Sequence, residues 1–210
     1  MIKILETDNQ IANLILDAMA GEINKALSKG AIKIERDVRN IVRAAITAQP
    51  EWGSLLTGRL RSEFGLPDSQ ERLNTILKIW SNSIVVYPVP AKRVAGRLKG
   101  GLRIDMIAGN FEDVISVPEA YFVTEKGVTL NWLEWLLKFG DRAIIRDYTI
   151  GVNPKRSRTG TDVMVKHVGK RWSVPPEFAG TINDNFLTRA LDSIQGQITD
   201  IVEKGIESSL

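Results

Sequence analysis

Residues 172–202 read WSVPPEFAGTINDNFLTRALDSIQGQITDIV, and this stretch decides how the C-terminal side of the chain is expected to fold. Thr181 and Asp184 have the spacing of a helix-capping box. Apolar residues then recur every three or four positions over several turns, at Phe186, Leu187, Ala190, Leu191, Ile194, Ile198, Ile201 and Val202. This periodicity predicts an amphipathic C-terminal helix over residues 181–208 with one buried face.

The N-terminal region, residues 1–50, has the same helical periodicity. Apolar residues at helical spacing over 11–27 predict a first helix. A more regular apolar stripe over 34–46 follows Gly30 and predicts a second helix, which Pro50 is expected to stop. The region is therefore expected to form one long helix or a helix pair.

Three shorter helical pieces are expected in the middle of the chain. Residues 51–67 are interrupted by glycine and predict short turns of helix, and residues 69–80 predict a longer one. Residues 130–139 carry Trp132 and Trp135 among leucines, so this segment predicts a short, nearly all-apolar helix. Such a helix must be buried or docked on another chain.

A first pair of strands is expected around a basic, glycine-rich link. Residues 83–87 are rich in β-branched side chains and predict a strand that Pro88 and Pro90 end. The alternation over 102–107 predicts the returning arm of a hairpin, with residues 91–101 as the link.

A second pair of strands is expected over residues 143–150 and 162–167, flanking a polar link at 151–161. Residues 121–124 predict a further strand or a loop edge. The β-rich region thus spans residues 83–168, with the Trp-rich helix inserted in it. We expect one α+β domain over residues 1–210, in which a small antiparallel β-sheet packs against the N-terminal helix or helix pair and the C-terminal helix.

Composition excludes several classes of protein. The chain has 210 residues, 43% of them apolar, which is enough for a core, and it has no cysteine, so disulfides and thiolate metal sites are excluded. The N-terminus lacks the apolar core of a signal peptide, and no stretch approaches the roughly 20 apolar residues that span a bilayer. We therefore expect a soluble protein without a membrane partner. A net charge of +3 is too small to indicate nucleic acid by itself.

No pattern of residues indicates catalysis, a cofactor or a metal. The single histidine, His167, has no nucleophilic serine near it in a suitable context, and a structural or surface role fits it better. The glycine-rich run at 96–101 lacks the spacing of a phosphate-binding loop. Scattered carboxylates at Asp141, Asp147 and Asp162 leave a metal-dependent hydrolase or nuclease as a weak alternative. We expect no catalytic, cofactor-binding or metal-binding residue, and no enzyme.

Two basic segments, residues 92–103 and 155–171, are candidates for contact with DNA or an acidic partner. Simple solvation of long loops is the plainer explanation, because no aromatic residues alternate with the basic ones to stack on bases. A DNA-binding module that uses these two loops is the main alternative function. The basic residues concerned are Lys92, Arg93, Arg97, Lys99, Lys155, Arg156 and Arg158.

Four segments, taken in order, resemble the neck and tail-completion proteins of tailed bacteriophages. They are LTGRLR at 56–61, LNWLEWLLKFGD at 130–141, PPEF at 175–178 and DNFLTRALD at 184–192. In that group a Thr-Gly-Arg-Leu turn follows the first helix, a Phe-Gly-Thr-like turn lies mid-chain, and a Phe-Leu-Arg-Ala-Leu segment opens the last helix. Here Asp141 stands in place of the threonine, and Thr188 intervenes before the arginine.

The resemblance implies a structural virion protein without catalysis. It implies a homo-oligomeric ring, expected to be a hexamer, that joins the head connector to the tail in the neck or tail-completion region. Expected partners are other neck, connector, tail-terminator, tube or sheath proteins, with genomic DNA passing through the ring unread. The protein would lie in the virion, and in the host cytoplasm during assembly. The residues expected at interfaces are Trp132, Trp135, Phe178, Phe186 and Arg189.

Overall fold

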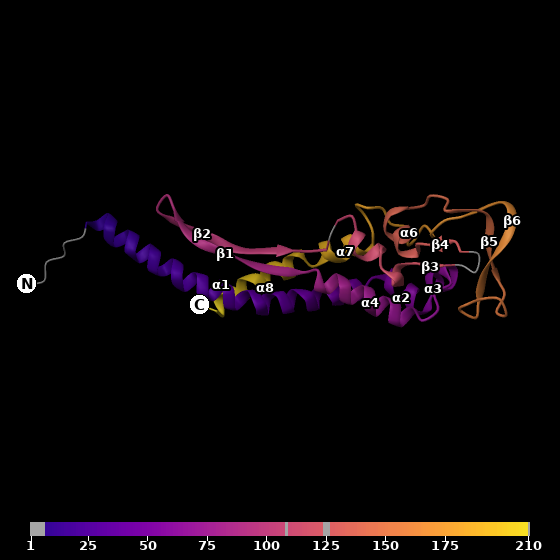
Figure 1. The fold of residues 1–210 in the computed structure, drawn as a ribbon, viewed down its shortest axis with the longest axis horizontal. Coiled ribbons are helices and arrows are strands. Elements are labelled where there is room, and N and C mark those ends of the chain that lie inside the picture. The colour runs from indigo at the N-terminus through magenta and orange to yellow at the C-terminus, as the bar shows by residue number, and fades with distance from the viewer. Residues whose placement is uncertain (1–6, 108, 124–126, 210) are drawn as a thin grey trace, which may run out of the picture. The chain divides into compact units, whose positions relative to one another are not determined.

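A computed structural model describes residues 7–107, 109–123 and 127–209 (Figure 1). These residues form helices and three two-stranded antiparallel sheets, which confirms the α+β class. The elements are α1 (Asp8–Thr47), α2 (Pro50–Thr57), α3 (Arg59–Phe64), α4 (Ser69–Asn82), β1 (Val85–Val94), β2 (Arg97–Asp105), α5 (Glu112–Ile115), the 3₁₀ turn η1 (Pro118–Ala120), β3 (Phe122–Val123), β4 (Thr129–Leu130), α6 (Trp132–Lys138), β5 (Ile145–Val152), β6 (Asp162–Trp172), α7 (Phe186–Ser193) and α8 (Gln195–Glu207).

The chain divides into two compact units. Unit 1 comprises Met1–Arg39, Ser83–Met106 and Gly196–Leu210, and unit 2 comprises Asn40–Asn82 and Ile107–Gln195. The expectation of a single domain stays a prediction.

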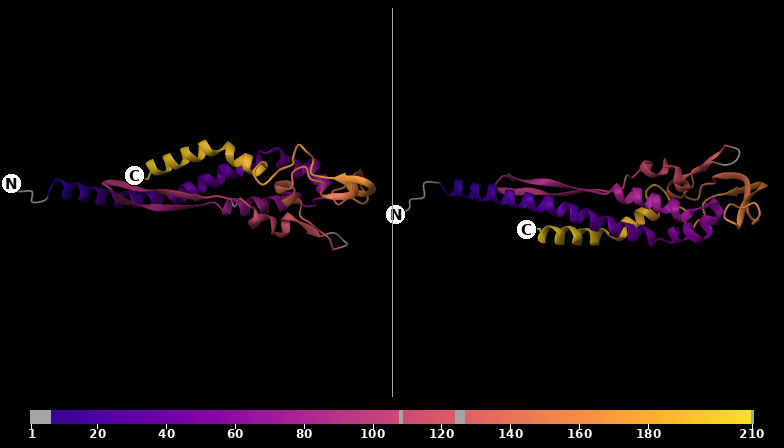
Figure 2. Two further views of the ribbon diagram at one scale, coloured as in Figure 1. Left: turned by 90° about the horizontal axis from the view of Figure 1, so that it is seen from above. Right: turned by 60° about the horizontal axis from the view of Figure 1, so that its bottom comes forward.

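In unit 1, α1 continues through Gly30, where the sequence suggested a break between two helices. Gly30 is buried, and a Cβ on it would lie 3.2 Å from the carbonyl oxygen of Gly205 in α8. A Cβ on Gly205 would lie 2.4 Å from Cγ1 of Ile34. The two glycines therefore allow α1 and α8 to approach closely (Figure 2), and Gly30 does not end the helix.

The β1–β2 hairpin is longer than expected, because Pro88 and Pro90 lie within β1 instead of ending it. In a two-stranded sheet each strand has a free edge, so a residue without an N–H group is tolerated there. The turn is at Ala95 and Gly96, whose φ angles of 49° and 72° suit a tight hairpin turn. Most of the predicted link at 91–101 is therefore strand.

The hairpin lies along α1, with β1 antiparallel to the helix. Four residue pairs join them: Arg39 with Ile84, Glu35 with Val86, Asn24 with Ala91, and Asp17 with Arg93. From Glu35 to Asn24 the helix rises about 16 Å. From Val86 to Ala91 the strand advances about 16 Å as well. The helix and the strand therefore cover the same distance between these two contacts.

A β-bulge at Ala91 anchors the hairpin to α1. The register shifts between Val89 and Lys92, so two residues of β1 face the single Gly100 of β2. The Ala91 N–H donates to Oδ1 of Asn24 at 2.6 Å, and the Ala91 carbonyl accepts from Nδ2 of Asn24 at 3.2 Å. The Asn24 side chain thus satisfies both backbone groups that the bulge exposes.

Unit 2 has an aromatic and aliphatic core that includes Trp80, Trp132, Leu55, Leu60 and Phe186, all essentially buried. The short helices α2 and α3 and the helix α4 occur where the sequence predicted them. In the second hairpin, β6 extends further than predicted, to Trp172, and β5 is shifted by two residues toward the turn. The short pair β3–β4 begins at Phe122, and position 124 of the predicted strand lies outside the described residues.

The predicted C-terminal helix is two helices, which separate at Ile194. Its capping box is formed by Asn185 and Thr188, not by Thr181 and Asp184. Oδ1 of Asn185 accepts from the backbone N–H groups of Leu187 and Thr188, and the Thr188 hydroxyl accepts from the Asn185 N–H. The helix therefore begins four residues later than the first candidate cap suggested.

Replacing Gly100 with alanine is expected to lower the free energy of unfolding by about 1 to 3 kcal/mol, because overpacking forces backbone movement. The new Cβ would lie 2.4 Å from Cα of Ala91, and the backbone of Ala91 cannot move away freely because its N–H donates to Asn24. Denaturant unfolding followed by circular dichroism measures the effect.

Gly21→Ala is the matched control. No atom lies within 4 Å of a Cβ at this position inside α1. The change is expected to stabilise the protein by about 0.5 to 1 kcal/mol. Equal stability of Gly100→Ala and the unaltered protein would show that β1 and β2 do not approach as closely as described.

Candidate interaction surfaces

The Trp-rich helix α6 is buried, as expected, against unit 2 itself. Trp132 is 0% exposed, and its Nε1 donates to the carbonyl of Glu119 at 3.0 Å. Trp135 is half-buried. Both rings contact Phe64 of α3, with centroids 6.0 and 6.4 Å away, and Trp135 also meets Trp172 at 6.0 Å. The two tryptophans therefore tie α6 to α3 and to the end of β6.

The remaining interface candidates also lie in unit 2. Phe186 is 1% exposed and contacts the Trp80 ring edge-on, with centroids 5.9 Å apart. Phe178 is half-buried. It is the last residue of a turn in which its N–H donates to the carbonyl of Pro175. Trp132 and Phe186 thus supply core packing, and only Trp135, Phe178 and Arg189 expose surface to a partner. Their interface role stays a prediction.

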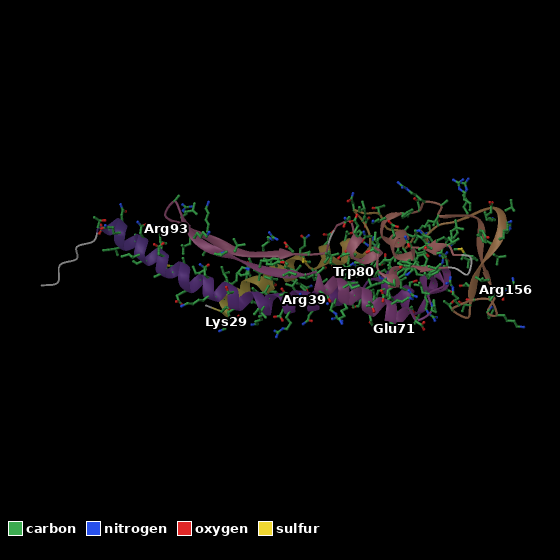
Figure 3. All side chains as sticks on the ribbon, viewed as in Figure 1. Lys29, Arg39, Glu71, Trp80, Arg93 and Arg156 are labelled. Carbon is green, nitrogen blue, oxygen red and sulfur yellow. The ribbon has the colours of Figure 1, made fainter. Side chains whose placement is uncertain are left out.

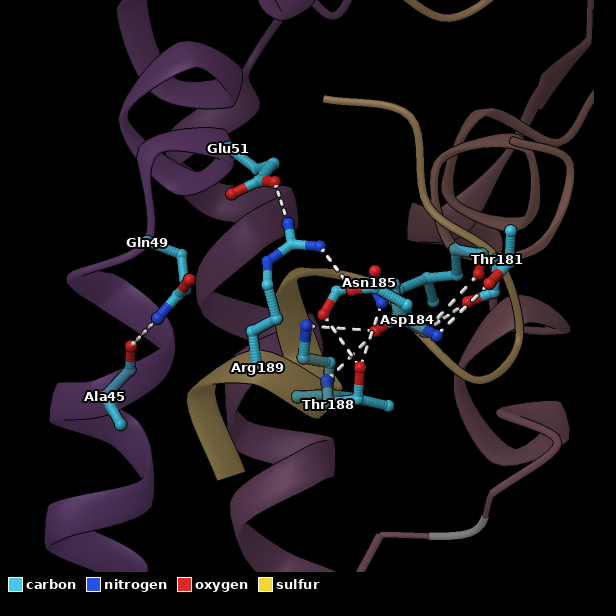
Figure 4. A network of polar contacts seen from close by, with 10 residues as sticks. Ala45, Gln49, Glu51, Thr181, Asp184, Asn185, Thr188 and Arg189 are labelled. Atoms are coloured by element: carbon cyan, nitrogen blue, oxygen red, sulfur yellow. Dashed lines mark hydrogen bonds and ion pairs between the residues drawn. The ribbon is translucent and has the colours of Figure 1, made fainter. Parts of the chain in front are cut away.

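Arg189 forms a clamp between α7 and α2 (Figure 4). Its guanidinium donates to Oδ1 of Asp184 at 2.9 Å and to Oε1 of Glu51. The Glu51 side chain is 1% exposed, and its second oxygen, Oε2, has no hydrogen-bond partner among the described residues. A buried carboxylate of this kind depends strongly on its one cationic neighbour. Glu51 lies in the first turn of α2, and no other feature of the sequence marks it.

The first basic segment lies in strands, where a loop was expected. In β1 and β2, Lys92 is directly opposite Lys99, and Val94 is opposite Arg97. Arg93, near the hairpin turn (Figure 3), forms an ion pair with Asp17 at 3.8 Å. No ion pair joins the other three basic side chains to an acid within residues 7–107, 109–123 and 127–209. Like charges directly opposite each other destabilise a strand pair, so an anionic partner would relieve this cost.

We call the exposed side of this hairpin the hairpin outer face. It combines the unpaired basic residues with apolar side chains that are about half exposed. Arg103 also belongs to it, although it is ion-paired with Asp105 at 2.7 Å, and its guanidinium lies 5.3 Å from the centre of the Tyr87 ring. The face consists of Tyr87, Val89, Lys92, Val94, Arg97, Lys99 and Arg103.

The second basic segment lies in unit 2 and is divided between a loop and β6. Lys155 and Arg156 are exposed in the loop that joins β5 to β6. Arg158 is engaged, because its guanidinium lies 4.1 Å from the centre of the Phe122 ring. The two basic segments thus belong to different units.

An exposed apolar stripe on α1 was missed in the sequence. Leu14, Ile15 and Met19 are 62%, 54% and 49% exposed, and Ile11 and Ala18 lie on the same side of the helix. We call these five residues the α1 stripe. The periodicity of residues 11–27 predicted a helix but not which of its apolar positions are exposed, and the segment is apolar around more of the helix than one core contact can cover.

Of the three carboxylates suggested for a hydrolase, Asp147 and Asp162 accept structural hydrogen bonds and Asp141 is exposed. Oδ1 of Asp147 accepts from the N–H of Gly169 at 2.8 Å in a bulge of the β5–β6 hairpin, and Asp162 accepts from the hydroxyl of Ser62. No group of three or more His, Asp or Glu side chains in the described ranges could hold a metal ion. His167 is exposed on β6.

Neither a ligand cavity nor a membrane segment stands out in the described residues. A hollow of about 500 Å³ lies over α4, but exposed side chains such as Glu71 and Lys78 line it, so it is an open surface depression. No described helix is both long and apolar enough to cross a membrane.

Arg189→Ala is expected to lower the free energy of unfolding by about 1 to 3 kcal/mol, because Glu51 then stays buried without its partner. The exposed pair of Arg59 and Glu177, whose side chains are 55% and 51% exposed, provides the control. Glu177→Ala is expected to cost less than about 1 kcal/mol. Thermal and denaturant unfolding would compare the two, and equal costs would contradict the clamp. Adding Glu51→Gln to the Arg189→Ala variant is expected to recover part of the loss.

Comparisons with known proteins assign no family to this chain. No family model matches it, and neither a curated protein nor a solved structure does.

Proposed function

We propose that the protein is a structural component of the neck or tail-completion region of a tailed phage virion. In this role it forms a homo-oligomeric ring between the head connector and the tail, and the ring is part of the DNA passage. It has no catalytic task. Its partners are neighbouring neck, connector, tail-terminator, tube or sheath proteins. It is found in the virion, and in the host cytoplasm while the particle assembles.

The observation that carries the proposal is that the segments resembling the phage family meet in unit 2. Arg59 of the LTGRLR segment donates to Oε1 of Glu177 in PPEF at 2.6 Å. Phe139, in the KFGD turn, forms a β-bridge with Thr181, just before DNFLTRALD. Gly140 donates its N–H to the carbonyl of Gly180 at 2.8 Å. Segments up to 118 residues apart along the chain thus pack together, as a shared fold signature would require.

Two departures from the family pattern have a local explanation. Gly140 has a φ of 61°, which favours glycine, and the following Asp141 is exposed, so the turn does not depend on a threonine there. Thr188 is the partner of Asn185 in the capping box of α7. Neither substitution disturbs the turn or the helix that the resemblance requires.

Mass measurement in solution together with electron microscopy of the purified protein tests this proposal. We expect closed rings of identical subunits, six in each, with a mass that is the corresponding multiple of 23.4 kDa. Docking on purified connector or tail components would identify the partner. A protein that stays at 23.4 kDa at high concentration and also in the presence of those components would contradict the proposal.

A DNA-binding module is the second candidate, favoured by the opposed and unpaired Lys92 and Lys99. It predicts binding to duplex DNA that weakens steeply with salt. Lys92→Ala with Lys99→Ala is expected to reduce the slope of log K against log salt by about 2, at roughly 0.9 per phosphate contact. Lys78→Ala, at an exposed position of α4, is the control. An unchanged slope in the double variant would reject this role for the hairpin.

A further inference from the structure

The positive charge of the chain is concentrated on the β5–β6 hairpin of unit 2. Residues 142–171 contain eight lysines and arginines and only two acids, Asp147 and Asp162. The whole chain has 28 lysines and arginines and 25 acids, so its remaining residues include more acids than bases. The net positive charge of the protein therefore resides in residues 142–171, which we call the basic hairpin.

The charge of the basic hairpin is not neutralised from within the chain. Both of its acids accept hydrogen bonds from uncharged groups, Asp147 from a backbone N–H and Asp162 from a hydroxyl. Among the eight basic residues, Arg158 lies against the Phe122 ring. The other seven are exposed and form no ion pair within residues 7–107, 109–123 and 127–209. They are Arg142, Arg146, Lys155, Arg156, Lys166, Lys170 and Arg171.

Two of these arginines lie directly opposite each other. Arg146 of β5 is paired with Arg171 of β6, and the neighbouring pair is Ile145 with the buried Trp172. Successive side chains of a strand point to opposite faces, so the two guanidinium groups face away from the core. Like charges directly opposite each other destabilise a strand pair. A phosphate bound between the two arginines would relieve this cost, because it accepts hydrogen bonds from both.

The strand β6 is uncovered over most of its length. Every residue from Val165 to Arg171 is exposed, whereas a strand that packs on one side buries every second residue. The one tyrosine of the basic hairpin, Tyr148, is half-buried, and the segment has no tryptophan or phenylalanine. The centres of protein–protein interfaces are depleted of charge and enriched in aromatic residues. Interfaces with DNA are far more positively charged, so the composition favours DNA over a protein partner.

The loop at the end of the basic hairpin is ordered. The Ser157 hydroxyl accepts from the N–H groups of Thr159 and Thr161, both at 3.2 Å. Lys155 and Arg156 are exposed in this loop (Figure 3). Their backbone is thus fixed before a ligand binds, which lowers the entropy cost of binding.

The unpaired charges extend along the whole basic hairpin. From Arg146 to the end of β5 the strand advances about 20 Å. Lys166 lies opposite Tyr148 within this length, and Lys155 lies beyond its end, in the loop. Over about 20 Å a DNA duplex carries about 12 phosphates. A linear polyanion can therefore contact charges at both ends and in the middle of the hairpin, whereas one small anion cannot.

We propose that the basic hairpin binds duplex DNA through its phosphate backbone. The major groove of B-form DNA admits a two-stranded ribbon, whereas the major groove of double-stranded RNA is too deep and narrow for side chains to enter. Proteins bind single strands by stacking aromatic side chains on the bases, and Tyr148 is the one such residue here. The inference goes beyond the proposed function, in which DNA only passes through the ring, and it does not depend on the ring.

The β1–β2 hairpin is a weaker candidate for the same ligand. Arg93 and Arg103 are ion-paired, so three of its basic residues are without an acid among those that the structure describes, against seven in the basic hairpin. Its outer face also carries apolar side chains that are about half exposed. A phosphate backbone would leave these apolar side chains without a suitable partner.

Binding of the purified full-length protein to a fluorescein-labelled duplex, measured by anisotropy over a series of salt concentrations, tests the inference. Arg146→Ala with Arg171→Ala is expected to reduce the slope of log K against log salt by about 2, at roughly 0.9 per phosphate contact. Lys155→Ala with Arg156→Ala is expected to have the same effect from the loop. Arg146→Lys with Arg171→Lys keeps both charges and is expected to keep the slope.

The matched control is Lys92→Ala with Lys99→Ala, which removes the same charge from the β1–β2 hairpin and is expected to leave the slope unchanged. A lower slope in this control, with normal slopes in both variants of the basic hairpin, would overturn the inference and support the second candidate function. Absence of binding by the unaltered protein at low salt would also overturn it. Displacement of the DNA by polyglutamate at equal charge would indicate an acidic protein partner instead, with the same consequence.

The outcomes separate this inference from the proposed function. Closed rings of a protein that does not bind DNA would overturn the inference and leave the proposed function standing. Binding that both variants of the basic hairpin weaken, by a protein that stays at 23.4 kDa, would support the inference without the proposed ring.

Discussion

The two hydrogen bonds between the Asn24 side chain and the Ala91 backbone determine the arrangement of unit 1. They satisfy the N–H and carbonyl groups of Ala91 that the bulge exposes, and they determine which part of α1 the hairpin lies against. The matching advance of helix and strand between this anchor and Glu35 lets the remaining contacts form without strain. With the anchor in place, the α1 stripe and the hairpin outer face necessarily point outward. The outward direction of these two candidate surfaces thus depends on one amide side chain.

Much of the fold could be predicted from the sequence, because local periodicity reports helices and strands directly. The helices, both hairpins and the burial of the Trp-rich segment followed from apolar spacing. Gly30 suggested a boundary between two helices, but α1 continues through it. A glycine is needed there because α8, from a distant part of the chain, packs closely against this position. The prolines in β1 were misjudged because only the sheet tells whether a strand has a free edge.

The candidate surfaces were harder to predict than the fold. Arg189 was singled out from a sequence resemblance, but its partner Glu51 is 138 residues away and no local pattern connects them. The α1 stripe could not be recognised from the sequence, because helical spacing does not distinguish exposed apolar residues from buried ones. The basic residues of the hairpin were recognised, yet their opposition across the strands depends on a register that the bulge shifts by one residue.

The composition of unit 1 has a consequence for how the chain folds as it is made. Its packing joins Gly30 and Ile34 in α1 to Gly205 in α8, residues separated by more than 170 positions. On a ribosome, α1 and the hairpin emerge long before α8 does, so unit 1 can close only late in synthesis. Unit 2 draws on residues 40–82 and 107–195 and can be complete earlier. A nascent chain therefore completes unit 1 last, after most of the chain has folded.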